Sequence, residues 1–166
     1  DSQIVCYDHP GMFSVARCAW MLRFFGAQNV RILNGGFQKW LKEGRPVFSG
    51  SYAPGQGLPD GDYRKDWAVQ DPSRVITDVK KVHEIAGKLY HGAPDWQITD
   101  ARPAARFNGE MPEPRDTRAG HITGSTNMPF GELVNSETGC MKSEEEIKAI
   151  FAGRGIDLAK KTVHSC

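Results

Sequence analysis

The sequence predicts an α/β fold, in which short parallel strands alternate with helices. Short apolar runs of strand length recur along the chain, and between them lie stretches whose apolar residues repeat at helical spacing. Turn residues, chiefly glycine, proline and asparagine, separate the two kinds of segment. The first quarter of the chain gives the order strand, helix, strand, helix, which is typical of α/β proteins.

The first four elements are read from the apolar pattern and the turns. We expect a strand over residues 3–7 that ends at Asp8, because a His-Pro-Gly turn follows it. A largely buried helix is expected over 13–25. A second strand over 29–33 and a short helix over 37–42 complete the series, and a glycine and a proline stop that helix.

The first helix carries a cluster of large apolar side chains. We assign this cluster to the core and not to a ligand-binding surface, because large apolar residues at helical spacing are usually buried. Its members are Trp20, Met21, Phe24 and Phe25.

Residues 48–72 predict a linker. They are rich in glycine, proline, serine and aspartate, and they show neither the strand period nor the helical one. A connection of this length without regular structure is uncommon inside one compact domain. We therefore divide the chain into residues 1–47, an interdomain linker over 48–72, and residues 73–166.

The second part again alternates helices and strands. An apolar series over 79–89 predicts a helix that starts after Thr77-Asp78. Ser143 and Glu146 have the spacing of a capping box, which predicts a further helix start. A strand is expected over 161–165, directly before the last residue.

Composition and charge exclude several classes of protein. Of the 166 residues, 39% are hydrophobic and 25% are charged, as in ordinary globular proteins. The net charge of +1 gives no general attraction to nucleic acid or acidic lipid. No apolar run is long enough to span a bilayer. We therefore expect neither a nucleic-acid partner nor a membrane partner.

The cysteines favour a reducing, intracellular environment. They are widely spaced and form no C-x-x-C pair, which makes a poor disulfide framework and a poor zinc site. We expect no metal and no other cofactor. The four are Cys6, Cys18, Cys140 and Cys166.

The stretch from Asp100 to Phe130 is the main candidate for a site. It follows a short apolar run over 96–98 that indicates a buried strand, and α/β proteins place ligand sites at strand ends. Its prolines and glycines suit an irregular loop better than a helix. Such a loop can present guanidinium groups to an anion. Its arginines are Arg102, Arg106, Arg115 and Arg118.

Four groups of residues resemble the rhodanese family of sulfurtransferases. Their order along the chain, with the capping-box helix between the third and the fourth, makes the signal specific. Within the family the chain is most similar to the two-domain 3-mercaptopyruvate and thiosulfate sulfurtransferases, over nearly its whole length. The groups are Asp100-Ala101-Arg102 with Arg106-Phe107; Met111-Pro112-Glu113-Pro114-Arg115; Gly120-His121-Ile122-x-Gly124-Ser125-x-Asn127-Met128-Pro129-Phe130; and Thr162-Val163-His164-Ser165-Cys166.

The resemblance implies tandem rhodanese-like domains, each a parallel sheet flanked by helices and each incomplete in this chain. Residues 1–47 would be the C-terminal half of a non-catalytic domain, and residues 73–166 the N-terminal part of the catalytic domain, ending at the nucleophile. The missing parts would be present as further segments of the protein. Asp8 would stand where the catalytic domain has its cysteine.

The resemblance also implies site residues. Cys166 is the expected nucleophile, since a thiol entering a loop at a strand end faces backbone N–H groups that favour the thiolate. Arg106 and Arg115 match the arginines that hold the donor's carboxylate and keto group, and their planar forks suit a carboxylate. The alternative for these arginines is a salt bridge to a neighbouring acid, among which are Glu110, Glu113 and Asp116.

Two further polar residues of the stretch are assigned structural roles. Asp100 is expected to fix the loop by accepting from backbone N–H groups, and His121 to bond locally. Arg102 and Arg118 are left as structural or surface residues.

The function implied by the resemblance is transfer of sulfur from 3-mercaptopyruvate, through a cysteine persulfide, to an acceptor. The acceptor would be a thiol such as thioredoxin, or cyanide, in the cytoplasm or in mitochondria. Thiosulfate is the alternative donor. Two other classes stay open: a cysteine-dependent phosphatase with a Cys-x5-Arg loop, and a non-catalytic interaction domain.

Overall fold

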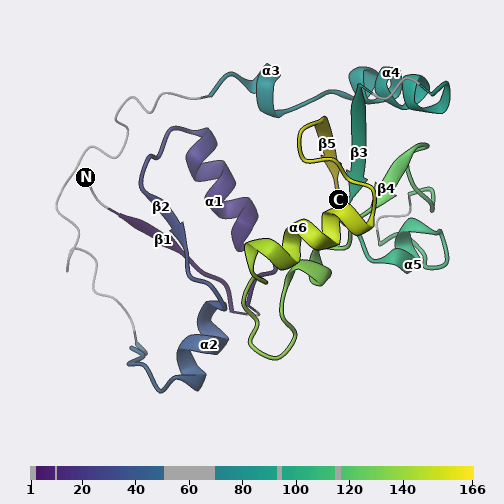
Figure 1. Ribbon diagram of the computed structural model, residues 1–166. Coiled ribbons are helices and arrows are strands. Elements are labelled where there is room, and N and C mark those ends of the chain that lie inside the picture. The colour runs from purple at the N-terminus through teal and green to yellow at the C-terminus, as the bar shows by residue number, and fades with distance from the viewer. Residues whose placement is uncertain (1–2, 10, 51–69, 93–94, 115–116) are drawn as a thin grey trace. The chain divides into compact units, whose positions relative to one another are not determined.

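The computed structural model describes residues 3–9, 11–50, 70–92, 95–114 and 117–166 (Figure 1). The chain forms two compact units. The first is Asp1–Pro72 with Ser136–Cys140, and the second is Ser73–Asn135 with Met141–Cys166. Both contain parallel strands flanked by helices, which confirms the predicted α/β class.

The first unit is a parallel two-stranded sheet with two helices (Figure 1). Strand β1, Ile4–Cys6, pairs with β2, Val30–Ile32. Helix α1, Val15–Phe24, connects them, and α2, Gly36–Lys42, follows. All four lie within one or two residues of their predicted bounds. The buried side chains of this core are Cys6, Val15, Ala19, Ala27 and Val30.

The predicted burial of the large apolar side chains at the end of α1 is wrong in three of four positions. Phe24 is buried, whereas Trp20, Met21 and Phe25 are 43%, 44% and 48% exposed. The helix is apolar on more than one face, and the short sheet covers the face of Val15 and Ala19. Helical spacing alone cannot distinguish the covered face from an uncovered one.

A tight turn joins β2 to α2. Gly36 has a φ of 58°, and a Cβ on it would lie 2.8 Å from the carbonyl oxygen of Asp8. The backbone N–H of Phe37 donates to that same oxygen at 3.0 Å. A side chain at Gly36 would push this contact apart, so glycine is required there.

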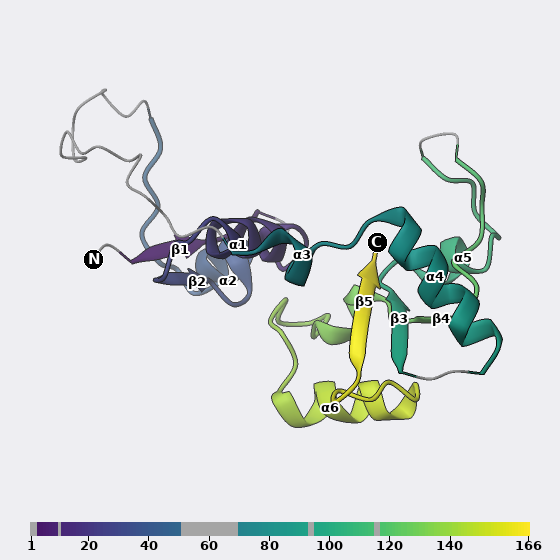
Figure 2. The same cartoon turned by 90° about the horizontal axis from the view of Figure 1, so that it is seen from above.

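The second unit holds a parallel sheet of three strands in the order β4-β3-β5 (Figure 2). Its strands are β3, Trp96–Asp100; β4, Ser125–Asn127; and β5, Lys161–Ser165. The longer helices are α4, Val79–Tyr90, and α6, Glu144–Gly153. Short turns of helix are α3, Pro72–Val75; α5, Ala104–Phe107; and the 3₁₀ turn η1, Phe130–Leu133.

The core of this unit lies where α4 packs against the sheet. Ile85 and Ile98 are each 1% exposed and Val163 is 8% exposed, so one face of α4 covers β3 and β5. The side chain of Asp78 accepts from the backbone N–H of Lys81, which confirms the predicted start of α4.

The capping box of α6 is present as predicted. The Ser143 hydroxyl accepts from the N–H of Glu146 at 3.3 Å, and the Glu146 carboxylate accepts from the N–H of Ser143 at 2.8 Å. Three glutamates in the first turn also complement the positive end of the helix dipole.

The stretch 100–130 is more regular than predicted. It contains α5 and the whole of β4, where only an irregular loop was expected. The strand β4 is short and reads Ser-Thr-Asn, so it lacks the apolar pattern by which strands are recognised. The predicted linker lies mostly outside the described residues. None of the helices in the described part of the chain is both long and apolar enough to cross a membrane.

Candidate active site

Three strand ends meet at one edge of the second sheet. In the parallel register, Asp100 at the end of β3 pairs with Asn127 of β4 and with Ser165 of β5. The N–H of Ala101 donates to the carbonyl of Ser165 at 2.9 Å, and the N–H of Met128 donates to that of Asp100 at 2.8 Å. The loops that leave the three strands therefore start side by side, as at the ligand-binding edge of other α/β sheets.

Asp100 anchors the loop after β3, as predicted. Its side chain is almost completely buried, and its Oδ1 accepts from the backbone N–H of Arg102 at 2.9 Å. The Arg102 guanidinium adds donors to both carboxylate oxygens. Burial alone would raise the pKa of Asp100, but the hydrogen bonds and charge of Arg102 outweigh it, so the pKa lies below the usual value of 3.8.

Arg102 connects several parts of this loop by hydrogen bonds. Besides Asp100, its guanidinium donates to Glu113 Oε1 at 2.7 Å and to the carbonyl of Gly120 at 2.8 Å. The side chain is 13% exposed. Removing such a charge would leave buried partners unpaired, so Arg102 holds the two ends of the loop together.

Asn127 is a positioning residue to which the sequence analysis assigned no role. Its Nδ2 donates to the carbonyls of Asp100 at 3.1 Å and Arg102 at 2.9 Å. It thereby fixes the loop after β3 to the end of β4. The position of Asn127 at the end of the Gly-Ser-x-Asn group could have indicated this role, because that position lies at the edge where the strands end.

Arg106 projects from the one-turn helix α5 and pairs with Glu113. Its Nη2 donates to Oε2 at 2.5 Å and its Nε to Oε1 at 3.4 Å, and the side chain is 29% exposed. The salt bridge that was considered as the alternative role of Arg106 therefore exists.

Arg106 and Cys166 belong to segments that leave neighbouring strands at the same edge of the sheet, since α5 follows β3 and Cys166 follows β5. The pKa of Arg106 is raised, first by its hydrogen bond to Glu113, then by the charge of Glu113 and by that of Cys166, while burial and Arg102 oppose the shift. The structure thus brings together two of the three predicted site residues.

Cys166 directly follows β5 and is free and exposed. The end of β5 is fixed to β3 by side chains as well as by the backbone. Thr99 Oγ1 and His164 Nδ1 lie 2.7 Å apart, and Ser165 Oγ donates to the carbonyl of Thr99 at 3.3 Å.

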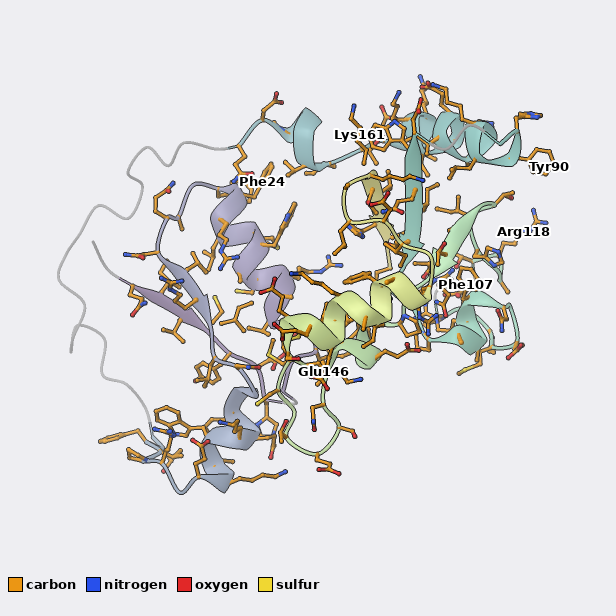
Figure 3. The ribbon with its side chains drawn as sticks, in the orientation of Figure 1. Phe24, Tyr90, Phe107, Arg118, Glu146 and Lys161 are labelled. Atoms are coloured by element: carbon orange, nitrogen blue, oxygen red, sulfur yellow. The ribbon has the colours of Figure 1, made fainter. Side chains whose placement is uncertain are left out.

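Arg115, the third predicted site residue, lies outside the described residues, as does Asp116. Arg118 is exposed on the same loop, and Figure 3 labels it together with Phe107 of α5. The prediction that His121 bonds locally is confirmed. Its Nδ1 lies 2.8 Å from the carbonyl of Phe107, and the two rings stack with centroids 3.8 Å apart.

The first unit has a carboxylate where the second has its thiol. Asp8 follows β1 as Cys166 follows β5, and its Oδ2 accepts from the N–H groups of Phe13, Ser14 and Val15 at 3.0, 2.8 and 3.1 Å. These N–H groups belong to the start of α1, where partial positive charge favours an anion. A strand end in this fold can therefore place a negative side-chain atom against several helix N–H groups.

Among the described residues, no group of three or more His, Cys, Asp or Glu side chains is arranged to hold a metal ion. The polar groups at the sheet edge are instead a thiol, two guanidinium groups and two carboxylates. This set suits an anionic substrate and a sulfur nucleophile.

Comparisons with known proteins find relatives over the whole length of this chain. The family model of the rhodanese-like domain matches residues 1–43. The 3-mercaptopyruvate sulfurtransferase of Escherichia coli K12 is 38% identical over 167 residues, which cover 100% of this chain and 54% of that protein. The thiosulfate sulfurtransferase of Cricetulus griseus is 36% identical over 170 residues, covering 100% and 52%.

The fold comparison gives the same result. The crystal structure of SseA from Escherichia coli, described as a 3-mercaptopyruvate sulfotransferase with the rhodanese fold, matches with a TM-score of 0.79 and 37% identity. The match covers 100% of this chain and 56% of that one. The chain therefore spans about half the length of the relatives that it matches.

Proposed function

Because the chain belongs to the rhodanese family, we propose that it is part of a sulfurtransferase that takes sulfur from 3-mercaptopyruvate through a persulfide on Cys166. The observation that supports the proposal is that Cys166 follows β5 at the same edge of the sheet where the segment with Arg106 follows β3. A nucleophile and an anion-binding group are the two parts that this reaction needs.

The first step forms the persulfide. The Cys166 thiolate attacks the sulfur of the donor, a sulfur–sulfur bond forms, and the carbon–sulfur bond breaks. The electron pair of that bond leaves with the carbon as the enolate of pyruvate, which then takes up a proton. The first step needs Cys166 as a thiolate. In the first unit, helix N–H groups donate to the Asp8 carboxylate, and equivalent N–H groups beside Cys166 would stabilise its thiolate in the same way.

The second step returns the enzyme to its starting state. An acceptor thiolate attacks the outer sulfur of the persulfide, takes that sulfur, and releases the Cys166 thiolate. We propose a thiol such as thioredoxin as acceptor, with cyanide as an alternative, and a cytoplasmic or mitochondrial location. Further segments of the protein would complete both domains.

Arg106 is the proposed binding group for the donor, and Arg115 is proposed to add a second contact to the carboxylate or keto group. A guanidinium can hold a carboxylate by two parallel hydrogen bonds. The partial exposure of Arg106 supports this role, because a donor could reach it. Thiosulfate is the second candidate donor, because the similar proteins include thiosulfate sulfurtransferases.

Turnover of a Cys166→Ser variant tests the proposal. We expect the full-length variant to lose sulfur transfer from both donors, because a hydroxyl cannot form a persulfide. Cys18→Ser serves as control, since Cys18 is also free and exposed but lies in the first unit. Full turnover in Cys166→Ser would refute the proposal.

A further inference from the structure

Glu113 lies between two guanidinium groups at the edge of the second sheet, and its side chain is only 6% exposed. Its Oε1 accepts from Arg102 and its Oε2 from Arg106, at 2.7 and 2.5 Å. We propose that Glu113 sets the donor specificity of the site: it orients Arg106 and favours a donor with one negative charge over a donor with two. This inference rests on the proposed function.

The contacts of Arg106 show how Glu113 orients it. A guanidinium is planar and carries five N–H donors in a fixed arrangement. In the described part of the chain, the contacts of Arg106 with Glu113 use Nε and Nη2, which form one edge of the group. The other edge, formed by Nη1 and the second N–H of Nη2, is then the edge to which a donor can bind. Because Glu113 fixes the plane of the Arg106 guanidinium before the donor binds, less side-chain entropy is lost on binding.

The charges of the cluster cancel. In both Asp100 and Glu113, hydrogen bonds and charge from the arginine partners lower the pKa, while burial raises it. The arginine partners outweigh burial, so the pKa of each acid lies below its usual value. Both are therefore ionised at neutral pH. Together with Arg102 and Arg106 they make two positive and two negative charges, so this cluster has no net positive charge.

A donor at Arg106 therefore also experiences the negative charge of Glu113. Mercaptopyruvate carries one negative charge at neutral pH, on its carboxylate, whereas thiosulfate carries two. Coulomb energy is proportional to the product of the charges, so Glu113 repels a dianion about twice as strongly as a monoanion at the same distance. Because Glu113 is almost completely covered, salt screens this repulsion less than at an open surface.

Asp100 does not account for a preference for the singly charged donor. Among the described residues, its carboxylate accepts hydrogen bonds from Arg102 and not from Arg106, and it is the more deeply buried of the two acids. Glu113 is the carboxylate that contacts the proposed donor-binding arginine. It is a positioning residue that acts through Arg106.

The test compares both donors in the full-length protein and its Glu113→Gln variant. We expect KM for thiosulfate to fall about three- to tenfold relative to KM for mercaptopyruvate, because the variant removes a unit charge beside Arg106. The two kcat values should keep their ratio. Glu110→Gln is the matched control, since Glu110 lies on the same loop, is exposed and pairs with Asn108. It should leave the ratio of the two KM values unchanged.

Each other outcome has a defined meaning. Equal changes in KM for both donors, or no change, would overturn the inference and leave the proposed function intact. Absence of transfer from both donors in the unmutated protein would instead overturn the proposed function, and the inference with it.

A second measurement needs no variant and therefore does not depend on the folding of Glu113→Gln. In the unmutated protein, the logarithm of kcat/KM should fall with ionic strength at similar, shallow slopes for both donors, because a neutral cluster attracts neither strongly. A slope for thiosulfate about twice that for mercaptopyruvate would indicate an uncompensated positive site and would overturn the inference.

Discussion

Arg102 and Arg106 lie four residues apart on one loop but in different environments. Arg102 is mostly covered and donates to two carboxylates and a carbonyl, whereas Arg106 is 29% exposed and contacts one carboxylate. Substitution of Arg102 should therefore act first on the fold of the loop, and substitution of Arg106 on the binding of an anion.

The arginines lead to a prediction about the donors. Arg106→Ala should lower kcat/KM by about ten- to a hundredfold for both mercaptopyruvate and thiosulfate, since both are anions. Arg115→Ala should produce such a loss for mercaptopyruvate alone, because thiosulfate is compact and has no distant carboxylate. Arg118→Ala, on the same loop and exposed, is the control. Equal losses on both donors for Arg115→Ala would make Arg115 a structural residue and favour thiosulfate as donor.

The buried carboxylate of Asp100 leads to a prediction about acid stability. Its pKa is lowered in the folded protein, so its stabilisation is fully present above the unfolded-state value of about 3.8 and is lost as pH falls through the lower folded-state value. Asp100→Asn should lower the free energy of unfolding by about 3 to 5 kcal/mol at neutral pH, because it breaks a buried ion pair.

Urea unfolding from neutral pH down to about pH 2 checks this prediction. The difference between the unmutated protein and Asp100→Asn should be constant above the unfolded-state pKa and should shrink below it. Asp78→Asn is the control, since an asparagine can also cap α4. A difference that stays constant down to the lowest pH would show that Asp100 does not act through its charge.

At the scale of elements, the sequence predicted the helices whose start is marked by capping residues close together in the chain. The capping box of α6 and the Asp cap of α4 could be predicted because a few neighbouring residues make the required contacts. The strand β4 could not, since it is held by its pairing with β3, which is distant in sequence. From the sequence, the possible salt-bridge partners of Arg106 were three nearby acids. The conformation of the loop, which the sequence does not show, determines that the partner is Glu113.

The capping box gives a prediction for α6. Ser143→Ala should destabilise the first turn by about 1 kcal/mol, because it removes the acceptor for the N–H of Glu146. Amide hydrogen exchange in that turn should accelerate by about fivefold. Ser14→Ala is a matched control, since Ser14 stands at the N-cap of α1 without a capping hydrogen bond from its side chain. An equal effect at both sites would contradict this account of α6.

At the scale of the whole molecule, the described residues leave apolar surface uncovered. The first unit has a sheet of two strands, and Trp20 and Met21 of α1 and the following Phe25 are exposed. A sheet of two strands has little stability by itself. Helical spacing predicted the helix but not which of its faces is covered, because that depends on residues far away in the sequence.

Residues 1–166 expressed alone should therefore behave as a loosely packed chain. We expect binding of a hydrophobic dye, association at micromolar concentration and a broad thermal transition. Analytical ultracentrifugation and calorimetry check this. A monomer that melts in one cooperative transition would contradict it.

The central claim is that Cys166 carries the transferred sulfur, and mass spectrometry of the full-length protein tests it most directly. The protein is incubated with mercaptopyruvate without an acceptor and then digested. The account predicts one added sulfur atom on the peptide that contains Cys166, and its removal by cyanide or a thiol. An unmodified Cys166 in protein that turns over, or the added sulfur on Cys6, Cys18 or Cys140, would contradict the account.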